Sequence, residues 1–288
     1  MFLGKRSLFV LTVIFIPALI QAQIALPRIS PNSKIEQTIG LTDITLEYSR
    51  PGKRGRELLG ALIPYGRIWR VGANESTNFG ISNDVLINGD TLKAGVYALY
   101  AFPEKEEWKI VFHKDTSLWG DGRTSYDENL DVLRVISQPY FEEEEVENFR
   151  IDFQDLTHNS GQMVWAWGKF RVACKIEVFT DQFVMNDIEH QTWTNPTAMT
   201  YYESARYLQE QGKDQEMALM YLDKAEIIGG PKYYVYRVRA LVLAQLERYE
   251  EAIRAAESSK LLAEEDGKDE FVSLNERSIK YWRKKIRN

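Results

Sequence analysis

The sequence contains little of what builds disulfides and metal centres. Among its 288 residues there is one cysteine, Cys174, and there are three histidines, so no disulfide can form within the chain even in an oxidising compartment. The histidines, His113, His158 and His190, lie in separate segments without metal-ligand spacing, which argues against a zinc site. Because Cys174 lies in an alternating apolar run, we expect a buried thiol rather than a nucleophile.

Signatures of nucleotide binding and of serine hydrolysis are absent as well. The chain contains neither Gly-Lys-Ser/Thr nor a glycine fingerprint that opens a helix, and it contains no Gly-X-Ser-X-Gly. Its formal net charge is −6, so binding to nucleic acid through bulk charge is not expected. Paired carboxylates of sugar hydrolases remain open, because their spacing is set in space rather than along the chain. We expect no cofactor and no nucleic-acid partner.

Long apolar runs are also lacking, with one exception near the N-terminus. Lys5 and Arg6 precede the uncharged run Leu8 to Ile20, and Ala22 follows it. This order of positive, apolar and small residues is what signal peptidase recognises, whereas a membrane-spanning helix needs about 20 apolar residues. We therefore predict a signal peptide over residues 1–22 and an exported, soluble protein, periplasmic or extracellular, without a membrane span. An uncleaved N-terminal anchor is the alternative.

The middle of the chain has the pattern of an antiparallel sheet protein. Short alternating runs separated by turn residues fill residues 30–179, which favours an antiparallel β-sandwich of roughly nine strands. Asn88-Gly89 is the strongest hairpin signal, because both turn positions need a positive φ. We expect the acidic run Glu142 to Glu145 to form a solvated turn and His113, at the end of a strand, to lie on the surface.

From Pro196 onward the period becomes helical. Residues 215–218 align with residues 249–252 at a spacing of 34 residues, the period of tetratricopeptide helix pairs. Residues 196–288 therefore resemble a small all-α domain of tetratricopeptide-like repeats, and the fold class is α+β multidomain. Two such units bury little surface alone, so we expect the helices to dock on the β-domain or to present a groove to a protein partner. A helical appendage that only stabilises the fold is the alternative.

The last helix ends in a run of cations. These are Lys280, Arg283, Lys284, Lys285 and Arg287. A run of like charge on a helix is most often a solvated face, and this is the interpretation that the sequence favours.

Positive charge also gathers between residues 48 and 77, inside an otherwise acidic chain. The cations of this segment are Arg50, Lys53, Arg54, Arg56, Arg67 and Arg70. Guanidinium groups beside Trp69 would bind a carboxylate, sulfate or phosphate through forked hydrogen bonds, with a ring to stack upon. The alternative is a structural polar network, in which Arg70 pairs with Glu75 and Asn74 caps backbone groups.

A family resemblance rests on these residues and on later motifs. The motifs occur in the order Ser49-Arg50-Pro51, Gly55-Arg56, Pro64-Tyr65-Gly66, Trp69-Arg70, Gly72-Ala73-Asn74-Glu75, Ile87-Asn88-Gly89, Ala94-Gly95-Val96-Tyr97, Trp119-Gly120 and Asp131-Val132-Leu133-Arg134. Over about residues 30 to 178 the chain resembles the secreted bacterial family catalogued as domain of unknown function 2911. That family usually has Thr after Trp-Arg, where this chain has Val71. The resemblance implies a β-domain in an exported protein and implies no activity.

These observations favour a binding protein, with a small anionic or carbohydrate-like ligand in the β-domain. The candidate ligand-binding residues are Arg50, Arg56, Trp69, Arg70, Asn74, Glu75 and Trp119. One alternative is a cell-envelope hydrolase that uses Glu75 as acid or base beside the arginines, and another is a purely structural envelope component. A Glu75 carboxylate free in a cleft would favour the hydrolase, and one buried against Arg70 would favour the structural network.

Overall fold

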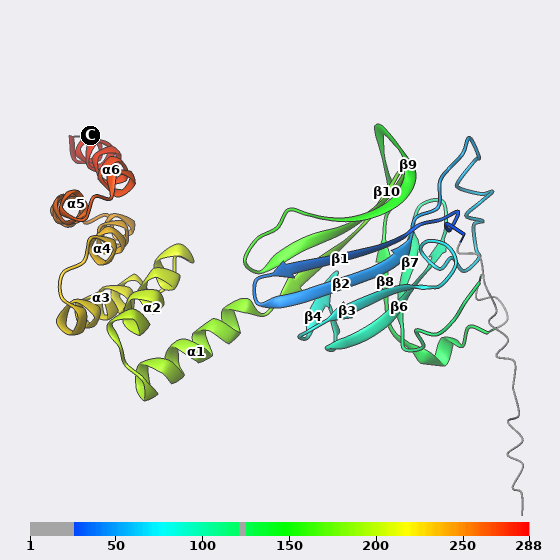
Figure 1. The fold of residues 1–288 in the computed structure, drawn as a ribbon, viewed down its shortest axis with the longest axis horizontal. Coiled ribbons are helices and arrows are strands. Elements are labelled where there is room, and N and C mark those ends of the chain that lie inside the picture. Colours follow the sequence, from blue (N-terminus) through cyan, green and yellow to red (C-terminus); the bar gives the residue numbers. More distant parts are fainter. Residues whose placement is uncertain (1–25, 121–124, 288) are drawn as a thin grey trace, which may run out of the picture.

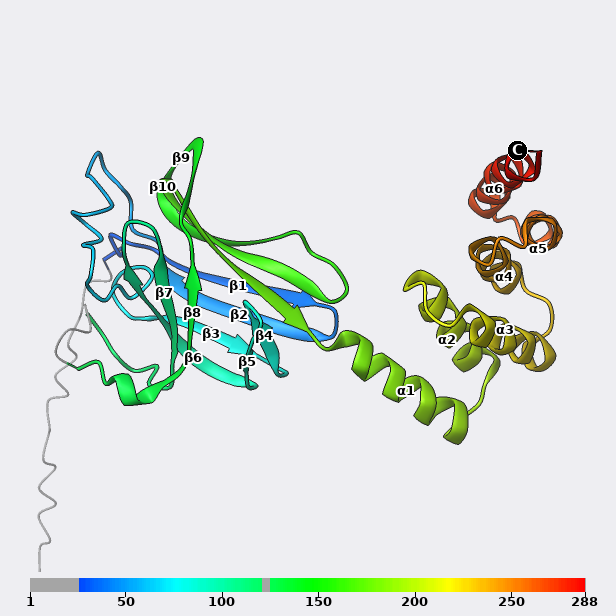
Figure 2. The same ribbon diagram turned by 180° about the vertical axis from the view of Figure 1, so that it is seen from behind.

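The computed structural model describes residues 26–120 and 125–287. The predicted signal peptide, residues 1–22, lies outside the described residues. A β-rich domain and a helical domain lie at opposite ends of the molecule and are joined by helix α1 (Thr180–Thr194), as Figures 1 and 2 show. The α+β multidomain fold class is confirmed. Helix α1 fills the segment that the sequence pattern left between the two domains.

The first sheet has six antiparallel strands in the order β1-β2-β3-β6-β7-β8. Their bounds are β1 (Asn32–Ile39), β2 (Thr42–Ser49), β3 (Thr77–Ile81), β6 (Gly95–Pro103), β7 (Trp108–His113) and β8 (Asp131–Ser137). In β2 the buried side chains Ile44 and Leu46 alternate with exposed Thr45 and Glu47. This period of two places one face of the strand in the core.

The second sheet has four antiparallel strands in the order β5-β4-β10-β9. Their bounds are β4 (Val85–Ile87), β5 (Asp90–Leu92), β9 (Tyr140–Gln154) and β10 (Ser160–Val178). The hairpin between β4 and β5 is confirmed, with Asn88 at φ 51° and Gly89 at φ 96°. The two sheets face each other and form the predicted sandwich.

The acidic run Glu142 to Glu145 is not a turn, and that expectation was wrong. These residues lie inside β9, in an irregular stretch between Phe141 and Val146, which pair with Phe170 and Gly168 of β10. A run of negatively charged residues can form a strand when its side chains are solvated or paired with cations. Glu143 pairs with Lys169 at 3.1 Å, and Glu142 pairs at 2.8 Å with Arg171, whose side chain is only 2% exposed.

The sandwich core is a single apolar cluster that both sheets supply. Trp69 lies at its aromatic centre, edge-on to Trp108 and Trp165 and stacked on Trp167, with ring centroids 5.8 to 6.4 Å apart. The expected buried thiol is confirmed, since Cys174 is 1% exposed and burial raises its pKa to about 12. A thiol with such a pKa is almost entirely protonated and therefore inert near neutral pH.

His113 is buried, contrary to its expected place on the surface. Its ring stacks on Tyr126 at 5.0 Å and meets Tyr100 edge-on at 5.5 Å. The ring nitrogens lie 3.2 Å from the Asp115 carbonyl oxygen and 3.0 Å from that of Asp127. Leu118 and Tyr126, which follow β7, pack over the outer face of the first sheet, and a strand pattern does not reveal such a cover.

The helical domain is a series of antiparallel neighbours. Its helices are α2 (Ala198–Glu210), α3 (Gln215–Gly229), α4 (Tyr233–Gln245), α5 (Tyr249–Glu265) and α6 (Asp269–Arg287). Helix α2 packs on α3, α4 on α5, and α5 on α6. Helices α3 and α5 begin 34 residues apart, the spacing that the sequence indicated, whereas α2 and α4 begin 35 residues apart. The tetratricopeptide likeness itself stays a prediction. No helix among the described residues is long and apolar enough to cross a membrane.

Polar contacts join the helical domain to the start of α1 and to the β-domain. Lys213 and Tyr207 both bind the Asp181 carboxylate, Tyr207 at 3.0 Å. Gln211 lies 2.7 Å from the ring nitrogen of His158, which belongs to the β9–β10 loop. These polar contacts add to the apolar packing of α1, whose Ile188 is buried in the same cluster as Tyr201 of α2.

Candidate functional site

The first half of the arginine-rich segment is tied to the edge of the second sheet. Lys53 donates its backbone N–H to the carbonyl of Glu147 at 2.8 Å, and Phe149 donates to the carbonyl of Pro51 at 2.9 Å. Gly52 forms a bridge with Asn148 of β9. These bonds place residues 51–53 beside β9, roughly a hundred positions away in the sequence.

The second half of the segment is tied to the first sheet. Trp69 and Ala101 of β6 exchange backbone hydrogen bonds of 2.7 and 2.8 Å, and Gly66 donates to the Pro103 carbonyl at 2.9 Å. The two halves are therefore attached to different sheets. The space between them is a cleft of about 530 Å³ that opens above the aromatic centre of the core.

This arginine cleft combines positive charge with apolar walls. Its cationic residues are Arg54, Arg56 and Arg70, and its apolar residues include Leu62, Trp69 and Trp167. None of the described residues that line it is acidic. Such a surface suits an anion that also has an apolar part, because guanidinium forks bind oxyanions and the walls exclude water.

Two of the arginines are held in place by backbone carbonyls. Arg56 donates from Nε to the Lys53 carbonyl at 3.0 Å and from Nη2 to the Gly52 carbonyl at 2.6 Å. Arg54 donates from Nη2 to the Ile29 carbonyl at 3.2 Å. A neutral acceptor orients a guanidinium group without neutralising its charge, so both groups keep donors for a ligand.

Arg70 precedes a strained piece of backbone. Val71 has φ 53° and is completely buried, and its carbonyl accepts a hydrogen bond from the Thr77 hydroxyl. A β-branched residue in this region is an outlier that costs on the order of 1–3 kcal/mol and persists only where the surroundings impose it. Arg70 Nη1 lies 4.0 Å from where a Cβ on Gly120 would be, so its guanidinium group reaches the loop that contains Trp119.

Glu75 lines a separate, neighbouring cleft of about 420 Å³. Its carboxylate pairs with Arg28 at 3.0 Å, and its side chain is 45% exposed. Glu47 lines the same cleft and accepts a hydrogen bond from Asn32 at 3.0 Å. Glu75 is therefore neither free nor buried against Arg70, and neither of the two arrangements expected from the sequence is found.

The remaining predicted site residues are distributed around the two clefts. Asn74 donates to the Ser49 hydroxyl at 3.1 Å and lies between the clefts. Arg50 donates to the Phe149 carbonyl at 3.1 Å and does not line the arginine cleft. Trp119 is 70% exposed, whereas Trp69 is 8% exposed and belongs mainly to the core.

The structure therefore brings Arg56, Trp69 and Arg70 together in one cleft and leaves the other predicted residues outside it. The sequence-based selection missed Arg54, although it lies in the same charge run. Arg54 and Gly55 form a tight turn, with φ of 52° and 70°, and the glycine is the residue in the sequence that favours such a turn. Trp167 was missed because only the pairing of β9 with β10 places it here.

Comparison with known proteins gives one result. A family model described as "Protein of unknown function (DUF2911)" matches residues 30–176. No curated protein and no solved structure matches the chain. Among the described residues no group of His, Cys, Asp and Glu side chains could hold a metal ion.

Proposed function

The chain belongs to the family of unknown function 2911, and we propose that it is an exported binding protein whose β-domain holds a small organic anion. The observation that supports this most strongly is the arginine cleft, where the guanidinium groups of Arg54 and Arg56 meet apolar walls and none of the described lining residues is acidic. The order of cations, apolar run and Ala22 in residues 1–22 supports export. The helical domain would contact a protein partner.

The ligand class follows from the size and chemistry of the cleft. Its volume of about 530 Å³ lies within the range of small-molecule sites, roughly 300–1,000 Å³. Arg54 and Arg56 are oriented by carbonyl oxygens before any ligand arrives, which lowers the entropy lost on binding. A carboxylate, sulfate or phosphate with an apolar or sugar body fits these features.

The hydrolase alternative receives less support. It requires Glu75 to act beside the arginines, but Glu75 pairs with Arg28 and lines the neighbouring cleft. A ligand held by Arg56 and Arg70 would have to extend into that cleft to reach the carboxylate. We therefore do not assign an acid or a base.

A ligand-stabilisation screen tests the proposal. The chain from Gln23 onward is unfolded thermally with carboxylates, sulfates, phosphates and anionic sugars. A ligand that binds only the folded state stabilises it by about 2.7 kcal/mol at a hundred times its Kd. We expect at least one anion to raise the Tm, and we expect Arg56→Ala to abolish that rise while leaving the ligand-free Tm nearly unchanged, since Arg56 is exposed.

Arg67→Ala is the matched control. Arg67 is exposed and lies in the same segment, but it does not line the cleft, so its variant should keep the full response. If no anion stabilises the parent protein, or if Arg56→Ala and Arg67→Ala respond alike, the cleft is not the binding site. A large loss of ligand-free stability in Arg70→Ala, with no ligand response in the parent, would make the segment a scaffold.

A further inference from the structure

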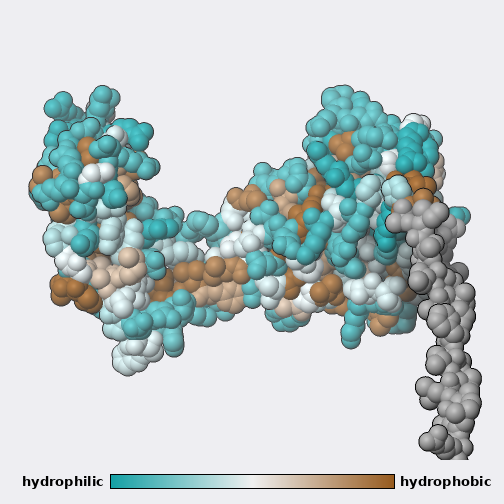
Figure 3. All heavy atoms as spheres, viewed as in Figure 1, coloured by the Kyte–Doolittle hydropathy of each residue, from teal (hydrophilic) through white to brown (hydrophobic). Residues whose placement is uncertain are grey.

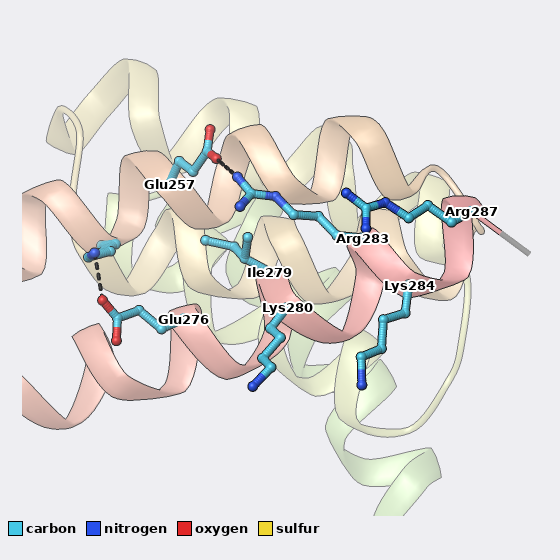
Figure 4. Close-up of a pocket in the computed structure, with 8 residues that line it drawn as sticks. Glu257, Glu276, Ile279, Lys280, Arg283, Lys284 and Arg287 are labelled. Carbon is cyan, nitrogen blue, oxygen red and sulfur yellow. Dashed lines mark hydrogen bonds and ion pairs between the residues drawn. The ribbon is translucent and has the colours of Figure 1, made fainter.

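A second cationic cleft lies between α5 and α6, far from the arginine cleft (Figures 1 and 4). Its volume is about 530 Å³. Its cations are Lys260, Lys280, Arg283, Lys284 and Arg287, and Glu257 and Glu276 also line it. The proposed function does not use this cleft.

Four of its cations form one stripe along α6. Positions 280, 283, 284 and 287 are three or four residues apart, so they share a side of the helix. Another side of α6 is buried through Ile279 and Trp282. In Figure 4 Lys280 and Lys284 extend in the same direction, one turn apart, while Arg283 reaches toward α5.

The acids of the cleft are already engaged. Glu257 pairs with Arg283 at 2.8 Å, and Glu276 pairs with Lys260 at 2.6 Å. The other three cations are Lys280, Lys284 and Arg287. Within residues 26–120 and 125–287, none of them has an acid at ion-pair distance. The cleft therefore has an excess of three positive charges in a chain whose net charge is −6.

Favourable interaction of cations with the C-terminal end of a helix explains part of this pattern. That effect is confined to about the last turn and is worth roughly 0.3–1 kcal/mol per charge. It accounts for Lys284 and Arg287 in the final turn of α6, but not for Lys280, which lies further back. It also does not explain why the cations line a cleft.

We propose that this cleft binds an acidic, extended segment of a partner protein. Lys280 and Lys284 are separated by about 6 Å along the helix axis, at about 1.5 Å per residue. Side chains on one face of an extended peptide recur about every 6.6 Å. Carboxylates at alternate peptide positions therefore match the spacing of the stripe.

A lipid surface fits this face less well. A helix that lies on a bilayer inserts an apolar face beside its basic one, but Ile279 and Trp282 of α6 are buried within the protein. The exposed Tyr281 and Ile286 are five residues apart and so do not form one face. On the face of the molecule that Figure 3 shows, the surface over α5 and α6 is mainly hydrophilic. This inference rests on the proposed function in one respect, because it names the chemical class of the protein partner proposed for the helical domain.

The test is fluorescence anisotropy with a labelled peptide of alternating Ser and Glu, on the chain from Gln23 onward. A peptide of alternating Ser and Gln is the uncharged match. We expect the Glu peptide alone to bind, with an affinity that falls as salt rises. We expect Lys280→Glu combined with Lys284→Glu to weaken binding by about tenfold or more.

The control variant combines Lys232→Glu with Lys268→Glu, which changes the net charge equally at exposed positions outside the cleft. It should bind the Glu peptide like the parent. Equal binding of both peptides, or an equal loss in both double variants, would overturn the proposal. Tighter binding of tripolyphosphate than of the peptide would make the cleft a small-anion site. The proposal would also be rejected if no peptide bound and the parent and the Lys280 and Lys284 variant sedimented equally with phosphatidylglycerol vesicles.

Failure here is separable from failure of the proposed function. Arg56→Ala should leave peptide binding unchanged, and the Lys280 and Lys284 variant should leave anion stabilisation of the β-domain unchanged. The two clefts share no residue.

Discussion

The two cationic clefts have similar volumes but are constructed differently. In the arginine cleft, Arg54 and Arg56 are fixed by backbone carbonyls, and no acid is found among the described lining residues. In the α5–α6 cleft, exposed lysines on one helical stripe share the space with two glutamates. A fixed guanidinium group loses little side-chain entropy on binding, whereas a flexible lysine loses more. The first arrangement suits a small ligand of defined shape, and the second suits a chain that can adapt.

The clefts also differ in how they depend on the fold. The arginine cleft exists only because Gly52 pairs with Asn148 and Trp69 pairs with Ala101. The stripe on α6 needs only the helix and its contact with α5. Damage to the sandwich should therefore remove the first cleft and leave the second.

Trp69→Ala should have the largest effect on this comparison. Trp69 is 8% exposed and contacts Trp108, Trp165 and Trp167, and removing a buried tryptophan costs about 3–5 kcal/mol. The β-domain should unfold at lower denaturant concentration, as followed by circular dichroism, while the α5–α6 cleft keeps its peptide binding. Trp119→Ala, at 70% exposure, should change the stability by less than about 0.5 kcal/mol. Similar losses in both variants would contradict the core position of Trp69.

Arg171→Met should have the next largest effect. Arg171 is 2% exposed, pairs with Glu142 at 2.8 Å and donates to the carbonyls of Gly168 and Glu144. Its removal leaves buried acceptors unsatisfied, so we expect a loss of about 2–4 kcal/mol in chemical unfolding.

Lys169→Met is the control for Arg171. Lys169 lies on the same strand and pairs with Glu143, which is fully exposed, and such surface pairs contribute about 0–1 kcal/mol. If the two variants were equally stable, the buried arginine would not join β9 to β10 as described.

The smallest expected effect concerns the junction between the domains and depends on pH. The Lys213 ammonium, and after it the Tyr207 hydroxyl, hold the pKa of Asp181 below its ordinary value. A lowered pKa gives stability that is present above the unfolded value of about 3.9 and is lost as the pH falls through the folded value. Burial, and then Asp181, raise the pKa of Tyr207 to about 12. The stability that this raised pKa gives the folded protein is therefore fully present below about pH 10 and is lost as the pH rises toward 12.

Asp181→Asn isolates this effect. Its stability relative to the parent protein should be lower at pH 6 and should approach equality at pH 3, as measured by thermal unfolding at the two values. Absorbance titration should show Tyr207 ionising at lower pH in the variant. A stability difference that is the same at pH 3 and pH 6 would show that the Asp181 carboxylate does not support the junction.

Local patterns predicted much of the fold. The hairpin at Asn88-Gly89, the buried Cys174 and the helical period after Pro196 each depend on a few neighbouring residues. The acidic run from Glu142 to Glu145 was misjudged because its strand depends on β10 and on basic partners elsewhere.

The candidate site was harder to predict, since its geometry comes from pairings across the chain. Trp69 and Trp119 look alike in the sequence, and only the bridge from Trp69 to β6 makes one of them a core residue. The pair between Glu75 and Arg28 spans 47 positions. No local pattern distinguishes it from the expected pair between Glu75 and Arg70.

The central claim is that the arginine cleft binds a small anion, and a crystal structure of the protein with the best anion from the screen tests it most directly. We expect the oxyanion to lie between Arg54 and Arg56, with the ligand body against Leu62 and Trp69. Ligand density in the cleft beside Glu75 and Arg28, with the arginine cleft holding only solvent, would contradict it.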